Sequence, residues 1–87
     1  MTIQGVRCYD NRWDLPAGGY CFLADEGNWY ARAPIEAEDY TGGLRKHTVT
    51  EHEDSTITVS PSIVFYTKDG KSVAWHGYLE RGIWREV

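Results

Sequence analysis

The chain has 87 residues, of which 14% are aromatic and 25% charged, and its formal net charge at pH 7 is −4. This length allows one domain with a modest core, so we expect residues 1–87 to form a single β domain. The acidic balance argues against a nucleic-acid binder or a protein of anionic membrane surfaces, which need a basic face. No apolar stretch approaches the roughly 20 residues that span a bilayer, and "MTIQGVRCYD" lacks a hydrophobic signal segment, which predicts a cytoplasmic protein without membrane contact.

Strand-favouring Thr, Val, Tyr and Trp dominate the sequence, which predicts a mostly β fold. In the first half, Asp, Asn, Pro and paired Gly make residues 10–19 a loop. A predicted turn at residues 25–28 separates two short apolar segments that we expect to pair as a hairpin. The strands predicted for this half are 2–9, with Gly5 as a candidate bulge, then 20–24 and 29–33.

Residues 34–43, "PIEAEDYTGG", allow two interpretations. Pro34 followed by acids suits the first turn of a helix. Gly42 and Gly43 would end such a helix at once, so a loop is the equal alternative.

The second half has clearer strand patterns. Ile57 and Val59 alternate with Thr and Ser, so they share one face of a strand. Pro61 is expected to interrupt that strand because it cannot donate to a ladder. Asp69-Gly70 is a hairpin-turn signal. The strands predicted here are 44–52, 56–60, 62–67, 72–80 and 83–87.

Arg81-Gly82 is predicted to be the two-residue loop of the last hairpin. Glu80 then faces Ile83, Leu79 faces Trp84, Tyr78 faces Arg85, and His76 faces Val87. The inward face would hold Val73, Trp75, Leu79 and Trp84, and the outward face His76, Tyr78, Arg85 and Val87. We therefore predict a core that contains Trp75, Leu79, Trp84, Ile57 and Val59.

Two segments, "TVTEHEDSTITVSPSI" (48–63) and "WHGYLERGIW" (75–84), resemble a family of small bacterial and phage proteins, the domain-of-unknown-function family 6527. Pro61-Ser62-Ile63, the run 76–79 and the run 82–84 carry the resemblance, which covers about the C-terminal half. It implies a phage or prophage origin. Many family members look like metal binders, and their pattern would make His76 a ligand. The family's cysteine cluster is absent here, so the resemblance implies a shared fold with the metal site lost.

A metal site of another form would draw on Cys8, Cys21, His47, His52 and His76. His47 and His52 are five residues apart, which puts them on opposite faces of one strand. Structural zinc needs about four close N or S ligands, usually in pairs. We therefore expect no cofactor and two buried thiols. A zinc-stabilised module built on Cys8, Cys21 and His76 is the alternative.

No enzyme motif is present: the sequence has no nucleophile elbow, no HExxH and no phosphate loop. A β domain of this length also rarely encloses a catalytic pocket. We therefore predict that the protein is not an enzyme.

Protein binding is the function that the remaining features favour. Trp13 and Arg12 share a loop, and an aromatic with an arginine is typical of interface hot spots; the alternative for Trp13 is a lid over the core. The acids between 25 and 54 predict either a patch for a basic partner or merely solvated loops. They are Asp25, Glu26, Glu36, Glu38, Asp39, Glu51, Glu53 and Asp54. The candidate protein-binding residues are Trp13, Arg12, Glu36, Glu38 and Asp39.

Taken together, the sequence predicts a small, mostly antiparallel β-barrel or sandwich of five to seven short strands with at most one short helix. The expected function is that of a non-enzymatic phage or prophage accessory protein, a monomer or small homo-oligomer in the host cytoplasm. It would bind a host protein, for instance to inhibit a defence complex. A zinc-stabilised module and a self-assembling structural virion component are the alternatives.

Overall fold

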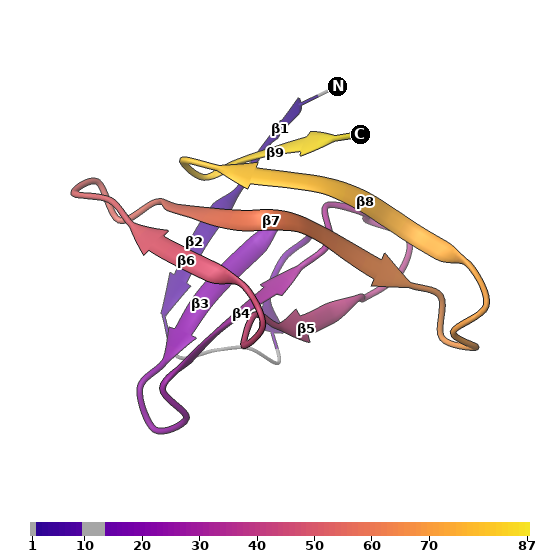
Figure 1. Cartoon of the computed structure of the whole chain (residues 1–87), viewed down its shortest axis with the longest axis horizontal. Coiled ribbons are helices and arrows are strands. Elements are labelled where there is room, and N and C mark those ends of the chain that lie inside the picture. Colours follow the sequence, from indigo (N-terminus) through magenta and orange to yellow (C-terminus); the bar gives the residue numbers. More distant parts are fainter. Residues whose placement is uncertain (1, 10–13) are drawn as a thin grey trace.

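Two packed sheets make up the protein in a computed structural model that describes residues 2–9 and 14–87 (Figure 1). The described strands are β1 (Thr2–Gln4), β2 (Val6–Tyr9), β3 (Gly19–Leu23), β4 (Asn28–Arg32), β5 (Thr41–Gly43), β6 (Thr48–Glu51), β7 (Ile57–Tyr66), β8 (Val73–Glu80) and β9 (Ile83–Glu86). Among the described residues there is no helix that could cross a membrane. The small all-β fold class is as predicted, whereas the nine described strands exceed the five to seven expected.

One sheet has five strands in the order β1-β9-β8-β7-β6, and the other has four in the order β2-β3-β4-β5. Pairing is antiparallel throughout, except that β2 and β3 are parallel. Parallel neighbours need a connection that returns the chain to the same end of the sheet. Residues 14–18, which include Pro16 and Gly18, lead into β3.

Gly5 is the point where the predicted first strand divides between the two sheets. Before it, β1 pairs with β9, and after it, β2 pairs with β3. The amide of Gly5 donates to the carbonyl oxygen of Gly82 at 2.7 Å. A Cβ at Gly5 would lie 2.6 Å from that same oxygen, so the crossing requires glycine.

Pro61 has the opposite outcome, because the two strands predicted around it are one strand, β7. The pairing of β7 with β8 is irregular between Val59 and Ile63, and Pro61 lies inside that irregularity. At a bulge the regular hydrogen-bond ladder is already interrupted, so the backbone N–H that proline lacks is not needed there. The prediction that Pro61 ends a strand was therefore wrong.

The segment 34–43 contains a loop followed by the short strand β5, and no helix is present in it. Gly42 and Gly43, which we expected to end structure, pair with Ala31 and Tyr30 of β4. The strand predicted at 44–52 is shorter than expected, because residues 44–47 form a turn before β6.

The main core lies between the two sheets. The five side chains predicted to form it, Trp75, Leu79, Trp84, Ile57 and Val59, are all buried there, and the four-stranded sheet adds Tyr20 and Ala31. The last hairpin has the predicted register, and both turn residues, Arg81 and Gly82, have positive φ. Val73 differs from prediction, since the register shift between Phe65 and Tyr66 leaves it 55% exposed.

A second, smaller apolar cluster contains Leu15, Cys21 and Leu23, with Cys8 and Tyr30 packed against it. Cys8, Cys21 and Tyr30 are paired neighbours on β2, β3 and β4. Strand alternation puts them on the face of the four-stranded sheet opposite the main core. The four-stranded sheet is thus apolar on both faces.

Candidate functional site

Arg7 on β2 lies between two aromatic rings at one end of the four-stranded sheet. Its Cζ atom is 4.7 Å from the centroid of the Tyr9 ring and 4.8 Å from that of Trp29. The ring of Phe22 lies 5.3 Å from that of Trp29 in a tilted arrangement. Cations at this distance from aromatic rings are attracted to them, and the Arg7 side chain is only 17% exposed. We call these four residues the aromatic cluster.

The strand period explains how the aromatic cluster forms. Arg7 and Tyr9 are two residues apart on β2, so their side chains share a face. The parallel register places Tyr9 beside Phe22, and Phe22 pairs with Trp29 across the β3–β4 hairpin. Three neighbouring strands thereby bring their aromatic side chains into one row.

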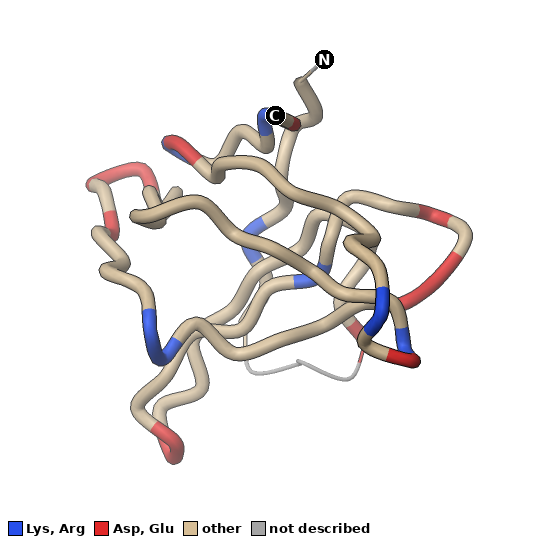
Figure 2. The backbone as a smooth tube through the Cα atoms, turned by 45° about the vertical axis from the view of Figure 1, so that its right-hand side comes forward, with Lys and Arg blue, Asp and Glu red and all other residues tan. Residues whose placement is uncertain are grey.

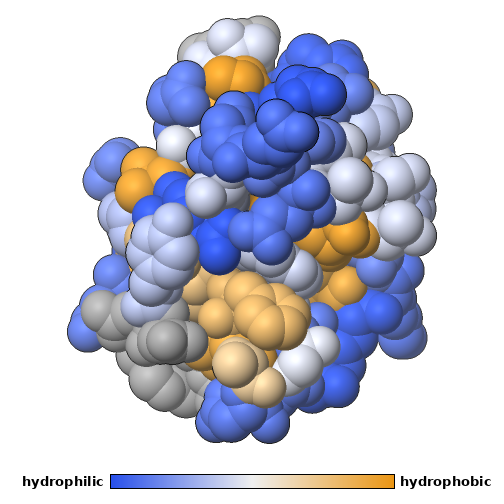
Figure 3. Space-filling model, turned by 90° about the vertical axis from the view of Figure 1, so that its left-hand side faces the viewer, coloured by the Kyte–Doolittle hydropathy of each residue, from blue (hydrophilic) through white to orange (hydrophobic). Residues whose placement is uncertain are grey.

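The aromatic cluster is open to solvent. Tyr9 is 66% exposed and Phe22 36% exposed. Figure 3 views the side of the molecule toward which β2 and β3 run, and its lower half shows an apolar area bordered by hydrophilic surface. Exposed apolar surface beside polar surface is characteristic of binding sites.

Arg7 also joins the aromatic cluster to the turn between β6 and β7. Its Nη1 atom donates to Oε2 of Glu51 at 2.8 Å and to the carbonyl oxygen of Ser55 at 2.9 Å. Residues 51–54, Glu-His-Glu-Asp, are called the acidic turn below. The aromatic cluster and the acidic turn are therefore parts of one continuous surface.

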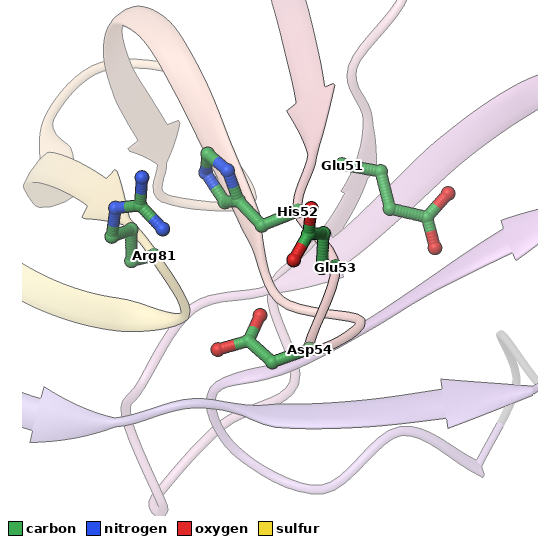
Figure 4. A pocket seen from close by; sticks show the side chains of 5 residues that line it. All are labelled: Glu51, His52, Glu53, Asp54 and Arg81. Atoms are coloured by element: carbon green, nitrogen blue, oxygen red, sulfur yellow. The ribbon is translucent and has the colours of Figure 1, made fainter.

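A hollow of about 530 Å³ lies between the acidic turn and Arg81 of the β8–β9 turn. Figure 4 shows His52 and Asp54 around it, facing Arg81, while Glu51 extends away. The hydroxyl of Thr56 and its backbone N–H donate to Asp54, which lowers the pKa of this carboxyl below its ordinary value. These bonds hold the carboxylate of Asp54 ionised and in place.

Two hydrogen-bond contacts converge on the hydroxyl of Thr58, next to His52. Nε2 of His52 lies 2.6 Å from Oγ1 of Thr58, and the backbone N–H of Arg81 donates to the same oxygen at 3.0 Å. The hydroxyl nearest the histidine is thus already held by two partners.

The predicted protein-binding residues fall in two places. Trp13 and Arg12 lie outside the described residues. Glu36, Glu38 and Asp39 are exposed on the loop between β4 and β5. Within that loop, Tyr40 donates to Glu38 at 3.0 Å, and Asp39 lies 3.7 Å from Nε of Arg32. Their contacts are local, and they lie apart from the aromatic cluster.

The eight acids between residues 25 and 54 do not form one patch. Figure 2 shows acidic residues on three separate loops, at 25–26, at 36–39 and at the acidic turn. The acidic turn is joined to the aromatic cluster through the bond between Arg7 and Glu51.

The alternative metal ligands are not brought together. Cys8 and Cys21 are paired on β2 and β3, on the outer face of the four-stranded sheet. His76 points from the outer face of the five-stranded sheet, where its Nε2 lies 3.0 Å from Oγ of Ser62. The whole core separates them. Across residues 2–9 and 14–87, no group of three or more His, Cys, Asp or Glu could hold a metal ion.

No sequence pattern singled out Arg7, Phe22 or Trp29, and Glu51 stood out only as one of eight acids between residues 25 and 54. One local signal was present: Arg7 and Tyr9 are two residues apart in a predicted strand, so they share a face, while Cys8 between them faces the other way. The pairing with Phe22 depends on the parallel register of β2 and β3, which no local pattern reveals. The aromatic cluster is therefore a product of tertiary structure.

Comparison of this chain with protein-family models, curated proteins and solved structures finds no match. The resemblance to the domain-of-unknown-function family 6527 therefore stays a prediction.

Proposed function

We propose that this protein is a non-enzymatic binding module that recognises a protein partner through the aromatic cluster and the acidic turn. One observation carries the proposal: Arg7 is stacked between Tyr9 and Trp29 and bonded to Glu51, so that an exposed aromatic surface continues directly into an acidic one. Tyr, Trp and Arg are the residues in which interface hot spots are richest.

The aromatic cluster suits a protein partner because it is already ordered. The Arg7 guanidinium contacts two rings, which restricts its side-chain conformation, and Phe22 packs against Trp29. A surface that is rigid before binding loses little side-chain entropy when it is covered.

The acidic turn favours a partner with a basic surface. Glu53 and Asp54 are exposed, and Glu51 keeps 49% of its side chain exposed although it pairs with Arg7. Acidic residues beside an apolar anchor attract lysine and arginine and set the orientation of the complex. The formal net charge of −4 acts in the same direction at longer range.

The resemblance to a phage and bacterial family extends this proposal to the identity of the partner. A phage or prophage accessory protein would act in the host cytoplasm, and its partner would be a host protein such as part of a defence complex. We propose that it works as a monomer or small homo-oligomer, without nucleic acid or membrane.

A comparative pull-down from host lysate tests the proposal. Tyr9→Ser with Phe22→Ser removes exposed apolar side chains from the aromatic cluster. Tyr66→Ser with Val73→Ser is the matched control, because these residues are 58% and 55% exposed and pair with each other elsewhere on the surface. We expect wild type and control to enrich the same protein, and the cluster variant to lose it.

The purified partner then gives the affinity. Truncating one hot-spot residue costs about 2 kcal/mol or more, so the loss of even one such contact should make the cluster variant bind at least about 30-fold more weakly by calorimetry. Equal affinities of the cluster variant and the control would refute the aromatic cluster as the binding surface. Trp13→Ala, measured in the same series, tests the loop residue that the sequence predicted.

A second pair of variants tests the charge of the partner. Glu53→Gln with Asp54→Asn neutralises the acidic turn, while Glu36→Gln with Glu38→Gln removes the same charge from the β4–β5 loop. For a basic partner we expect the first pair to slow association and flatten its salt dependence. If only the second pair does so, the partner docks on the loop and the acidic turn has no part in binding.

A further inference from the structure

The turn between β5 and β6 encloses a second polar site, at the corner where the chain passes from one sheet to the other. The backbone N–H of His47 donates to the carbonyl oxygen of Leu44 at 3.1 Å, which closes a four-residue turn. Leu44 is buried, whereas Arg45 and Lys46 at the tip are exposed. Two hollows of about 370 and 380 Å³ lie here and share Asn28, Arg45 and His47. We call this region the corner pocket.

Asn28 is the buried polar residue of the corner pocket. It is only 6% exposed, yet its Nδ2 atom has no hydrogen-bond partner within the described part of the chain. A buried amide nitrogen without an acceptor costs about 1–3 kcal/mol. Because Asn28 lines both hollows, an acceptor atom of a ligand is the partner that would remove this cost.

His47 supplies a second buried nitrogen. Its Nε2 atom lies 3.2 Å from the carbonyl oxygen of Ser62, and since a carbonyl only accepts, Nε2 carries the proton. Nδ1 is buried and has no partner among residues 2–9 and 14–87. With the proton on Nε2, Nδ1 is an acceptor, so the donors available to an anion here are Asn28, Arg45 and Lys46.

The charge of the corner pocket is positive. Arg45 and Lys46 stand at its rim, and Glu26 pairs with Arg45, its Oε1 lying 3.9 Å from Nη2. Glu26 also accepts a hydrogen bond from the hydroxyl of Tyr30. Arg45 and Lys46 therefore carry two positive charges beside the single negative charge of Glu26, which also accepts the bond from Tyr30.

Gly43 keeps the approach to Asn28 open. A Cβ on Gly43 would lie 3.0 Å from Nδ2 of Asn28 and 3.3 Å from the Tyr30 ring. A side chain at this position would therefore cover the amide. From these contacts we propose that the corner pocket binds a small oxyanion, a phosphate or carboxylate group, which accepts from Asn28 and pairs with Arg45 and Lys46.

This site differs from the proposed protein-binding surface. It adjoins the aromatic cluster only at Trp29, which lines one of the two hollows. Arg7, Tyr9 and Phe22 take no part in it. Either proposal can therefore fail while the other stands.

Nuclear magnetic resonance of the labelled protein tests the proposal directly. Sodium phosphate and sodium acetate are titrated separately against sodium chloride of equal ionic strength. We expect the side-chain NH₂ signals of Asn28 to shift and saturate, with a Kd on the order of 1 mM. Saturation by either anion supports the proposal and identifies the group that is bound; saturation by neither, or an equal effect of chloride, overturns it.

Two variants assign the shift to the corner pocket. Arg45→Gln with Lys46→Gln should weaken binding by about tenfold or more, since two charge-assisted contacts are lost. Lys68→Gln with Lys71→Gln removes the same charge from the exposed β7–β8 turn and should leave binding unchanged. Equal weakening in both pairs would mean that net charge alone attracts the anion, and the site would be rejected.

Asn28→Asp places a carboxylate oxygen where the unpartnered nitrogen lies. We expect this variant to lose saturable binding. The exposed Arg45 and Lys46 variants still decide the question where Asn28→Asp does not fold. Unchanged affinity of a folded Asn28→Asp protein would show that Asn28 does not contact the anion.

Discussion

Trp84 and Gly18 are joined by a buried hydrogen bond, in which Nε1 of the indole donates to the carbonyl oxygen at 2.8 Å. Trp84 lies on β9 of the five-stranded sheet, and Gly18 directly precedes β3 of the four-stranded sheet. The two residues are 66 positions apart in the chain. This bond therefore ties the two sheets through the core and satisfies the only polar atom of a buried tryptophan.

Trp84→Phe should destabilise the protein by about 2–4 kcal/mol, because the carbonyl of Gly18 loses one of its two donors, keeping only the amide of Val6, and a void forms in the core. Urea unfolding followed by circular dichroism measures the change. Tyr66→Phe, on an exposed side chain, should shift stability by less than about 0.5 kcal/mol. A Trp84→Phe protein as stable as this control would contradict a structural role for the bond.

Gly77 and Gly42 should respond to alanine in opposite ways. A Cβ on Gly77 would overlap the carbonyl oxygen of Arg85 and lie 2.5 Å from the Trp75 ring. We expect Gly77→Ala to cost about 3 kcal/mol or more, or to prevent folding. Nothing lies within 4 Å of a Cβ on Gly42, so Gly42→Ala should be neutral or slightly stabilising. Thermal unfolding of both variants gives the comparison, and equal melting temperatures would argue against the packing around β8 and β9.

Asp54 should make stability depend on pH in the acid range. The Thr56 hydroxyl and backbone N–H lower the pKa of Asp54 in the folded state. A lowered folded-state pKa gives stability that is complete above the unfolded pKa, ordinarily about 3.9, and is lost as the pH falls through the folded value. Asp54→Asn keeps an acceptor oxygen at every pH and should therefore lose less stability than wild type from about pH 5 to about pH 2.

Urea midpoints across this range measure the effect of Asp54→Asn. Glu36→Gln, which removes the same charge from an exposed acid, is the control and should follow wild type. Superimposable profiles of Asp54→Asn and Glu36→Gln would show that the Thr56 bonds do not matter for stability.

The backbone conformation at position 81 should favour asparagine over arginine. Its φ is 48°, in the left-handed region that costs most L-residues about 1–2 kcal/mol but that asparagine adopts more readily. We expect Arg81→Asn to stabilise the last hairpin by about 0.5–1 kcal/mol. Gly82→Ala, at φ 77°, should destabilise it. Denaturant midpoints measure both changes. A loss of stability in Arg81→Asn would show that contacts of the arginine side chain contribute more than relief of the unfavourable backbone conformation.

Cys8 should react slowly with alkylating reagents. Burial raises the pKa of its thiol above the ordinary value, although the Tyr20 backbone and Arg7 act to lower it. Less thiolate is then present at neutral pH, and Cys21 is fully buried. Mass spectrometry after iodoacetamide treatment should show little modification of either residue until urea unfolds the protein. Rapid labelling of Cys8 in the folded protein would contradict this environment.

Local signals predicted the parts of the fold that local interactions determine. Arg81-Gly82 determines the register of the last hairpin, and with it the inward direction of Trp75 and Trp84. The alternation around Ile57 and Val59 likewise places both in the core. In each case the signal is local: side chains alternate between the two faces of a strand, and the turn residues set the register of the adjoining strands.

The sequence could not show which sheet each strand joins. Gly5 was expected to be a bulge within one strand, but the same small residue lets the chain change sheets. The aromatic cluster depends on that change, because β2 brings Arg7 and Tyr9 to β3 only after leaving the five-stranded sheet. Asn28 is another example, since an asparagine at a hairpin turn gives no sign that it will be buried.

The pairing of β1 with β9 leaves the first and last strands side by side, with Thr2 opposite Arg85 (Figure 1). In an antiparallel pair the backbone bonds run perpendicular to the strands. A pulling force between the two ends would thus load those bonds one after another, as a zipper opens, instead of all at once. Mechanical unravelling would begin at this seam and stop at Gly5, where the chain enters the other sheet.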